Sequence, residues 1–86
     1  MASYRIEWKP SALKELRKLP NDAIVRIVLA VERLKENPLP HGSQKLSGGH
    51  SSYRIRTGDY RVIYTVSDAL LVVEIVKIGH RKDVYK

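Results

Sequence analysis

Apolar and polar residues alternate at the start of the chain and then give way to a helical repeat. The alternation covers residues 3–8 and predicts a half-buried strand. The helical repeat covers residues 10–19, and Pro10 suits its first turn because a backbone N–H is not needed there. Pro20 is predicted to end this first helix.

A second helical repeat is predicted over residues 21–37. Asn21 or Asp22 is expected to be the N-cap, and the residue before Pro38 is disfavoured in a helix. The apolar positions that recur at helical spacing are Ile24, Ile27, Val28, Val31 and Leu34. Because the two helices are separated by a very short connection, we expect an antiparallel helical hairpin that packs on a sheet.

The second half of the chain predicts an antiparallel meander. Residues 38–52 are rich in Pro, Gly and Ser and are predicted to form a loop of a length that often has a function. Strands are predicted over 52–57, 60–66 and 70–78. The expected fold is therefore α+β in the order β-α-α-β-β-β, with the N-terminal helical hairpin on one face of a mostly antiparallel four-stranded sheet. A single domain of residues 1–86 is expected.

A two-residue turn at Gly58–Asp59 fixes the register of the first hairpin. Arg56 then lies opposite Arg61, and Arg54 lies opposite Ile63. The apolar residues that share the other face are Tyr53, Ile55, Val62, Tyr64 and Val66. Like charges directly opposite each other destabilise a ladder by a few tenths of a kcal/mol to about 1 kcal/mol, so the arginine face needs an explanation.

The arginine face has two interpretations. It is either a solvated face whose long side chains spread apart in water, or a group of guanidiniums that surrounds a polyanion. The planar fork of arginine matches phosphate and stays protonated at physiological pH, which favours the second interpretation. Because arginine does not accept a proton, a catalyst would need further groups.

The overall charge also favours an anionic partner. Sixteen Lys and Arg against nine acids give a net charge of +7 on 86 residues. Nucleic acid is the first candidate, while an acidic protein, an anionic membrane or a charge that serves only solubility are alternatives. The chain has neither a signal peptide nor an apolar run of the ~20 residues needed to cross a bilayer, so we expect a cytoplasmic protein.

No metal or cofactor is expected. The sequence has no cysteine, and His41, His50 and His80 lack the spacing of metal ligands. No glycine motif that cradles phosphate precedes a helix.

The tail "GHRKDVYK" holds the candidates for proton transfer. Histidine can act as acid or base near neutral pH, and adjacent cations favour the anionic form of tyrosine, which makes His80 and Tyr85 candidates. The alternatives are a polar surface histidine, a packing tyrosine and, for Arg81, one more solvated charge.

The order of elements, with "QKLSGG" in the loop, "YRIRTGDYRVIYTV" in the hairpin and "VKIGHRKDVYK" at the end, resembles the RelE branch of the RelE/ParE toxin superfamily. The resemblance covers nearly the whole chain. It implies a toxin of a type II toxin–antitoxin pair that enters the A site of the 70S ribosome and cuts messenger RNA there. The implied reaction is metal-independent attack of a ribose 2′-hydroxyl on the adjacent phosphodiester, and the implied partner is an acidic RelB-like antitoxin.

The same resemblance implies roles for the arginines. Arg61 and Arg81 correspond to family arginines and would hold the scissile phosphate and its transition state. Arg54 and Arg56 fall on the basic positions of the first hairpin strand and would position the RNA backbone. Other basic residues would contact ribosomal RNA through salt-sensitive phosphate contacts. These are Lys45 in the loop and Lys14, Arg17, Lys18 and Arg26 on the helices.

The chain departs from some family members at positions that concern proton transfer. Some members carry lysines where Arg54, Arg56 and His80 stand. Because arginine cannot shuttle protons, Tyr85 is expected to take the 2′-hydroxyl proton. His80 is expected to be the acid on the leaving oxygen or the alternative base.

The ParE branch, whose members poison DNA gyrase, is the main alternative. It shares the fold and a strand like "YRVIY", but it generally lacks the terminal tyrosine and the concentrated basic set. "HRKDVY" therefore favours the nuclease. A basic RNA-binding module without catalysis is the third possibility.

Overall fold

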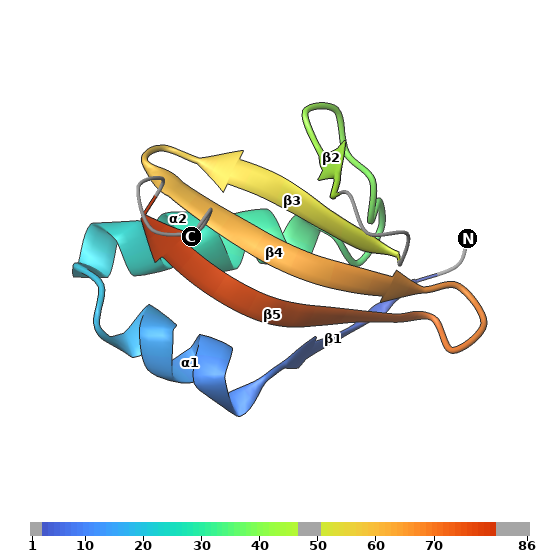
Figure 1. Ribbon diagram of the computed structural model, residues 1–86, viewed down its shortest axis with the longest axis horizontal. Helices are drawn as coiled ribbons and strands as arrows, with labels where there is room; N and C mark the ends of the chain where they lie inside the picture. The colour runs from blue at the N-terminus through green and yellow to red at the C-terminus, as the bar shows by residue number, and fades with distance from the viewer. Residues whose placement is uncertain (1–2, 47–50, 81–86) are drawn as a thin grey trace.

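Two helices cover one face of a five-stranded sheet (Figure 1). The computed structural model describes residues 3–46 and 51–80. In chain order the elements are β1 (Arg5–Trp8), α1 (Pro10–Arg17), α2 (Asn21–Arg33), β2 (Gln44–Lys45), β3 (Ser52–Thr57), β4 (Tyr60–Ser67) and β5 (Val72–His80). The strand order is β1-β5-β4-β3-β2, with β1 parallel to β5 and the other pairs antiparallel. The predicted α+β class is confirmed, and β2 adds a fifth strand to the predicted four.

α1 follows the predicted pattern but ends earlier. Pro10 occupies the first turn, and Ala12 and Leu16 are buried against the sheet. The helix ends at Arg17, and the N–H of Leu19 bonds to the carbonyl of Leu16 at 3.1 Å in a tighter last turn. Neither helix in the described part of the chain is long and apolar enough to cross a membrane.

α2 begins without the predicted side-chain cap. Pro20 stands at the N-cap position, and its carbonyl accepts the N–H of Ile24 at 3.0 Å. The prediction of Asn21 or Asp22 as N-cap is therefore wrong, because both residues are already helical. The regular helix ends at Arg33, where turns replace its predicted last residues.

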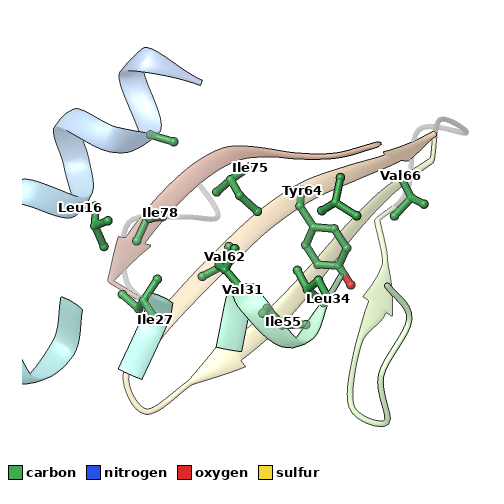
Figure 2. Close-up of a cluster of buried hydrophobic side chains, with 12 residues drawn as sticks. Leu16, Ile27, Val31, Leu34, Ile55, Val62, Tyr64, Val66, Ile75 and Ile78 are labelled. Atoms are coloured by element: carbon green, nitrogen blue, oxygen red, sulfur yellow. The ribbon is translucent and has the colours of Figure 1, made fainter. Parts of the chain in front are cut away.

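The helices and the sheet share one hydrophobic core, shown in Figure 2. Its fully buried large side chains are Ile27 and Val31 from α2, Leu34 directly after α2, and Val62, Tyr64, Val73, Ile75 and Ile78 from the strands. Burying each aliphatic side chain of this size contributes roughly 1.5–3 kcal/mol relative to exposure in water. The predicted apolar face of α2 is confirmed at its centre, whereas Ile24 and Val28 are half-buried at its margin.

Tyr64 ties the loop after α2 to this core. Its ring is fully buried, and its hydroxyl donates a hydrogen bond of 2.7 Å to the carbonyl of Pro38. Burial raises the pKa of Tyr64 to about 12, because the phenolate loses its hydration. This hydrogen bond anchors the start of the loop that leads to β2 on the helix side of the sheet.

The predicted hairpin register is confirmed. Arg56 lies opposite Arg61 and Arg54 lies opposite Ile63, with Gly58 in the turn at φ +61°. A positive φ at this position favours glycine. The two-residue connection therefore directs alternate residues of β3 and β4 towards the helices and away from them.

A bulge at Val76 changes the direction of the last residues of β5. Tyr64 pairs with Ile75, whereas the preceding residue Ile63 pairs with Lys77, so Val76 is the extra residue. Strict alternation from Ile75 would turn Lys77 towards the helices. The bulge instead buries Ile78 and places Lys77 on the opposite face.

The turn between β4 and β5 comes later than predicted. Leu70 and Leu71, expected at the start of a strand, lie in the turn, and Leu71 has φ +54°. The hydroxyl of Ser67 accepts the N–H of Leu70 at 3.2 Å, and the carbonyl of Leu71 accepts the N–H of Arg5 at 2.8 Å. Leu70 is 75% exposed at the tip of the hairpin.

Candidate nucleic-acid interface

Basic side chains gather on the sheet face that points away from the helices, which we call the outer face. Cross-strand neighbours in a sheet lie about 4.5–5.5 Å apart, so side chains in one row are close together. Two neighbouring rows across β3, β4 and β5 are Arg54–Ile63–Lys77 and Arg56–Arg61–Gly79. Four cations therefore surround Ile63, and we call these four, Arg54, Arg56, Arg61 and Lys77, the basic cluster.

Arg61 is the most deeply placed member of the basic cluster. Its side chain is only 8% exposed, although it lies on the outer face. It stands on β4, the middle strand, and its neighbour on β5 is Gly79, which has no side chain to compete for the space. A charge held away from water interacts more strongly with a bound anion, because the local dielectric is lower.

β2 orients a second member of the basic cluster. Gln44 lies directly opposite Arg54 across the ladder, and its amide oxygen accepts a hydrogen bond from a guanidinium nitrogen of Arg54. The sequence interpretation missed Gln44 because a two-residue strand inside a Gly- and Ser-rich segment has too little pattern to be recognised. "QK" carries no periodic signal of its own.

His80 lies on the other side of the sheet. It pairs with Tyr60, and the two rings meet edge to face with centroids 5.9 Å apart. Tyr60 packs against the core on the helix side, so the alternation directs His80 away from Arg61. The structure therefore does not bring His80 into the basic cluster. Arg81 and Tyr85 lie outside the described residues.

Comparison with known proteins identifies the family. The family model described as ParE toxin of type II toxin–antitoxin system, parDE, matches residues 6–85. The chain belongs to the RelE/ParE toxin superfamily. The putative toxin RelE1 of Methanocaldococcus jannaschii is 33% identical and aligns over 96% of each chain. The mRNA interferase toxin RelE of Escherichia coli K12 is 30% identical over 93% of this chain and 85% of its own.

Solved structures agree with this assignment. The chain matches the RelE of an archaeal RelE–RelB complex from Pyrococcus horikoshii with a TM-score of 0.84 and 33% identity, over 95% of this chain and 99% of that one. It matches isolated E. coli RelE toxin with a TM-score of 0.81 and 30% identity, over 96% and 92%. The predicted RelE-type resemblance is confirmed.

Lys77 is a further basic residue that the sequence interpretation of this RelE-type chain missed. Lys14 of α1 and Lys18 at its C-terminal end line a groove of about 420 Å³ together with Lys77. Between them the carboxylate of Glu15 accepts the N–H of Ile78 at 3.2 Å, which holds β5 just after its bulge. A basic path therefore runs from α1 to the outer face. Only knowledge of the bulge at Val76 could have found it.

The other predicted RNA-binding residues lie in different places. Arg17 is exposed on α1 and borders a neighbouring groove with Lys14. Arg26 extends towards the hairpin turn, with a guanidinium nitrogen 3.7 Å from the position that a Cβ would take at Gly58. Lys45 lies opposite Tyr53, on the helix side of the sheet, so the structure does not join it to the basic cluster.

The three guanidiniums of the basic cluster can hold a phosphodiester but cannot accept a proton. Guanidiniums bind phosphate oxygens through two parallel N–H bonds and stay charged throughout a reaction. Within residues 3–46 and 51–80, no group of three or more His, Asp or Glu side chains could hold a metal ion. The chemistry that the described face supports is therefore anion binding and stabilisation of negative charge.

Proposed function

We propose that this RelE-type chain is a ribosome-dependent endoribonuclease that cuts messenger RNA in the A site and so inhibits translation. The observation that carries the proposal is the basic cluster, in which three guanidiniums and Lys77 surround Ile63 on one open sheet face. The name mRNA interferase, printed for the E. coli relative, supports the same reaction class. The place of action would be the cytoplasm, where ribosomes and their messages are found.

In the proposed reaction the ribose 2′-oxygen attacks the neighbouring phosphorus and the bond from phosphorus to the 5′-oxygen breaks. The products are a 2′,3′-cyclic phosphate and a 5′-hydroxyl. Arg61 and Arg81 would bind the phosphate as negative charge develops on it, while Arg54 and Arg56 hold the backbone on either side. The fixed guanidinium charges would do the work that a metal ion does in other nucleases.

Proton transfer falls to the tail in this proposal. Tyr85 would take the 2′-hydroxyl proton, and a second group would return a proton to the 5′-oxygen. The pairing of His80 with Tyr60 on the helix side makes His80 the weaker candidate for either step. We therefore place Tyr85 ahead of His80.

The test is primer extension on messenger RNA with purified ribosomes. Native protein should produce cuts at fixed codon positions, and Arg61→Ala should lose them. Arg5→Ala is the matched control, because Arg5 stands on the outer face of β1 and pairs with Glu7. Absence of codon-positioned cuts by the native protein would sink the proposal. Equal cutting by Tyr85→Phe would remove only the assigned base.

The match to the ParE family model favours a second candidate, an inhibitor of DNA gyrase. A supercoiling assay with purified gyrase separates the two functions, since a gyrase poison would block supercoiling and leave messages intact. A basic RNA-binding module would instead bind RNA without cutting it.

We also propose an antitoxin partner. Several of the matched structures are toxin–antitoxin complexes, among them RelE–RelB from Pyrococcus horikoshii and RelBE from E. coli. A RelB-like antitoxin for this chain should be acidic, because the toxin carries a net charge of +7.

A further inference from the structure

The last residues of β5 extend beyond the strand that borders them. β1 pairs only with residues 72–75, and the N–H of Lys9 then bonds to the carbonyl of Ile75 at 3.0 Å as the chain leaves the sheet. Among the described residues, no strand lies beside residues 76–80 on this side of β5, and α1 lies there instead (Figure 1). Backbone groups on this edge of β5 therefore need partners other than a strand.

Glu15 of α1 supplies one such partner. Its carboxylate oxygen Oε1 accepts the N–H of Ile78 at 3.2 Å. Ala12 and Leu16, which share this side of α1, are buried against the sheet, so the helix holds Glu15 at a fixed place beside β5. A hydrogen bond to an ionised acceptor is roughly twice as strong as one between neutral groups. The carboxylate therefore fastens β5 just after the bulge at Val76.

Both chain neighbours of Ile78 belong to the basic end of the outer face. Lys77 is a member of the basic cluster, and Gly79 is the register partner of Arg61. Because the Arg61 side chain is almost completely buried, its place depends on where the backbone of Gly79 lies. Peptide units are stiff, so a shift of β5 at Ile78 would move Lys77 and Gly79 with it. The bond from Glu15 to Ile78 therefore acts one residue away from the backbone that borders Arg61.

We propose that Glu15 is a positioning residue for the cleavage reaction, which fixes the Arg61 guanidinium by holding the end of β5 through the N–H of Ile78. The inference rests on the proposed function, because it assumes that Arg61 stabilises negative charge on the scissile phosphate. Stabilisation of this kind needs a charge that is in place before the reaction begins, and a displacement of about 1 Å can cost roughly 10²-fold in rate. Glu15 acts from the edge of the sheet and needs no contact with RNA.

The charge of Glu15 offers a rival explanation. Glu15 lines the same groove as Lys14, Lys18 and Lys77, where a carboxylate lowers the positive potential that attracts RNA. A role of that kind depends on the charge alone, and it changes the binding of RNA more than the rate of cleavage. Positioning depends on the reach of the side chain to Ile78, and it changes the rate. Two substitutions separate these requirements.

The experiment compares two variants of the full chain, Glu15→Asp and Glu15→Gln. The first keeps the charge but is one methylene shorter, and the second keeps the length and an acceptor oxygen but is neutral. Glu15→Asp should lower kcat for ribosome-dependent cleavage by about tenfold to a hundredfold with KM within about twofold of native, and Glu15→Gln should stay within about threefold in both. Glu32→Asp is the matched control, because Glu32 is a helix carboxylate that pairs with Lys35 at 2.9 Å, and it should cleave as the native chain does.

A second measurement, by NMR, needs no ribosome. Glu15→Asp should speed exchange of the Ile78 amide hydrogen by about tenfold or more and shift the Nε–H signal of Arg61. The amide of Val73, in the part of β5 that β1 covers, should exchange as in the native chain. Glu15→Gln and Glu32→Asp should leave all of these signals close to their native positions.

Several results would overturn the inference. They are native kinetics for Glu15→Asp, equal losses in Glu15→Asp and Glu15→Gln, a change confined to KM, or faster Ile78 exchange with an unmoved Arg61 signal. Should thermal unfolding show that Glu15→Asp does not fold, Glu15→Gln decides alone, because impaired cleavage by that variant contradicts the proposal. Absence of cuts by the native chain would contradict the proposed function only, since the NMR signals still test the link between Glu15 and Arg61.

Discussion

On the outer face, two pairs of like-charged residues lie opposite each other, and the charges that surround the two pairs differ. Near β1, Glu7 is the register partner of Glu74, and Arg5 donates to the carboxylate of Glu7 at 2.8 Å. Near β3, Arg56 faces Arg61, and the two charged residues of the neighbouring row are the further cations Arg54 and Lys77. One end of the face therefore balances its charge locally. The other end concentrates charge that an external anion can balance.

The largest effect expected from this difference concerns Arg61. Arg61→Ala should lower ribosome-dependent cleavage by roughly 10²–10³-fold, as removal of one preorganised charge-stabilising group does in other enzymes. Arg5→Ala, at the balanced end, should leave the rate within about twofold of native. The rates are compared by primer extension, with thermal unfolding to show that both variants fold. Similar losses in both variants would erase the distinction between the two ends.

A substitution at Tyr64 tests how much the hydrogen bond between Tyr64 and the Pro38 carbonyl, in the core beneath the basic cluster, contributes to stability. Tyr64→Phe removes the donor to the Pro38 carbonyl and should lower the free energy of unfolding by about 1–3 kcal/mol near neutral pH. Because burial raises the pKa of Tyr64 to about 12, native stability should be fully present below pH ~10 and should fall as pH rises towards about 12.

The phenylalanine variant should lack this alkaline decline. Denaturant unfolding at a series of pH values checks both statements, because each variant is its own reference at neutral pH. Parallel pH profiles for the two proteins would mean that another group is responsible.

A smaller effect with opposite signs on stability and activity is expected at Arg56. Arg56→Glu turns a repulsive cross-strand pair into an attractive one and should raise the free energy of unfolding by about 0.2–1 kcal/mol. It should at the same time lower cleavage, because a carboxylate repels the RNA backbone. Glu74→Gln at the other end should leave cleavage unchanged. Destabilisation by Arg56→Glu would contradict the repulsion inferred from the register.

The smallest effect is expected for Gln44. Gln44→Ala removes the amide partner of the Arg54 guanidinium and should slow cleavage by a factor of about two to ten, through a higher KM more than a lower kcat. Gln44→Glu keeps an acceptor and places a carboxylate against Arg54, so it should hold Arg54 more tightly. Identical kinetics for native protein and Gln44→Ala would show that β2 does not position Arg54.

Some features could be predicted from the sequence because short-range rules determine them. The Gly58–Asp59 turn fixes which residues of β3 and β4 face each other, and this rule alone predicts that Arg56 lies opposite Arg61. The helical repeat likewise locates Ile27 and Val31 in the core. In each case a local pattern and burial point to the same arrangement.

Other features could not be predicted because tertiary contacts decide them. Val76 looks like any strand residue, yet the bulge there sends Lys77 to the outer face and puts Gly79 beside Arg61. The bulge lets Ile78 enter the core, and no local sequence rule predicts this. The same bulge decides the face of His80, which the sequence interpretation groups with the arginines.

The parallel pairing of β1 with β5 has a consequence for how the chain folds during its synthesis. Arg5 pairs with Val72 and Trp8 with Ile75, so β1 gains its strand neighbour only after β5, far later in the chain, has been synthesised. Contacts so distant in the chain form late and slow the folding of a domain. The basic cluster is completed by Lys77 only when β5 has joined the sheet. The basic cluster is therefore incomplete during most of the synthesis of the chain.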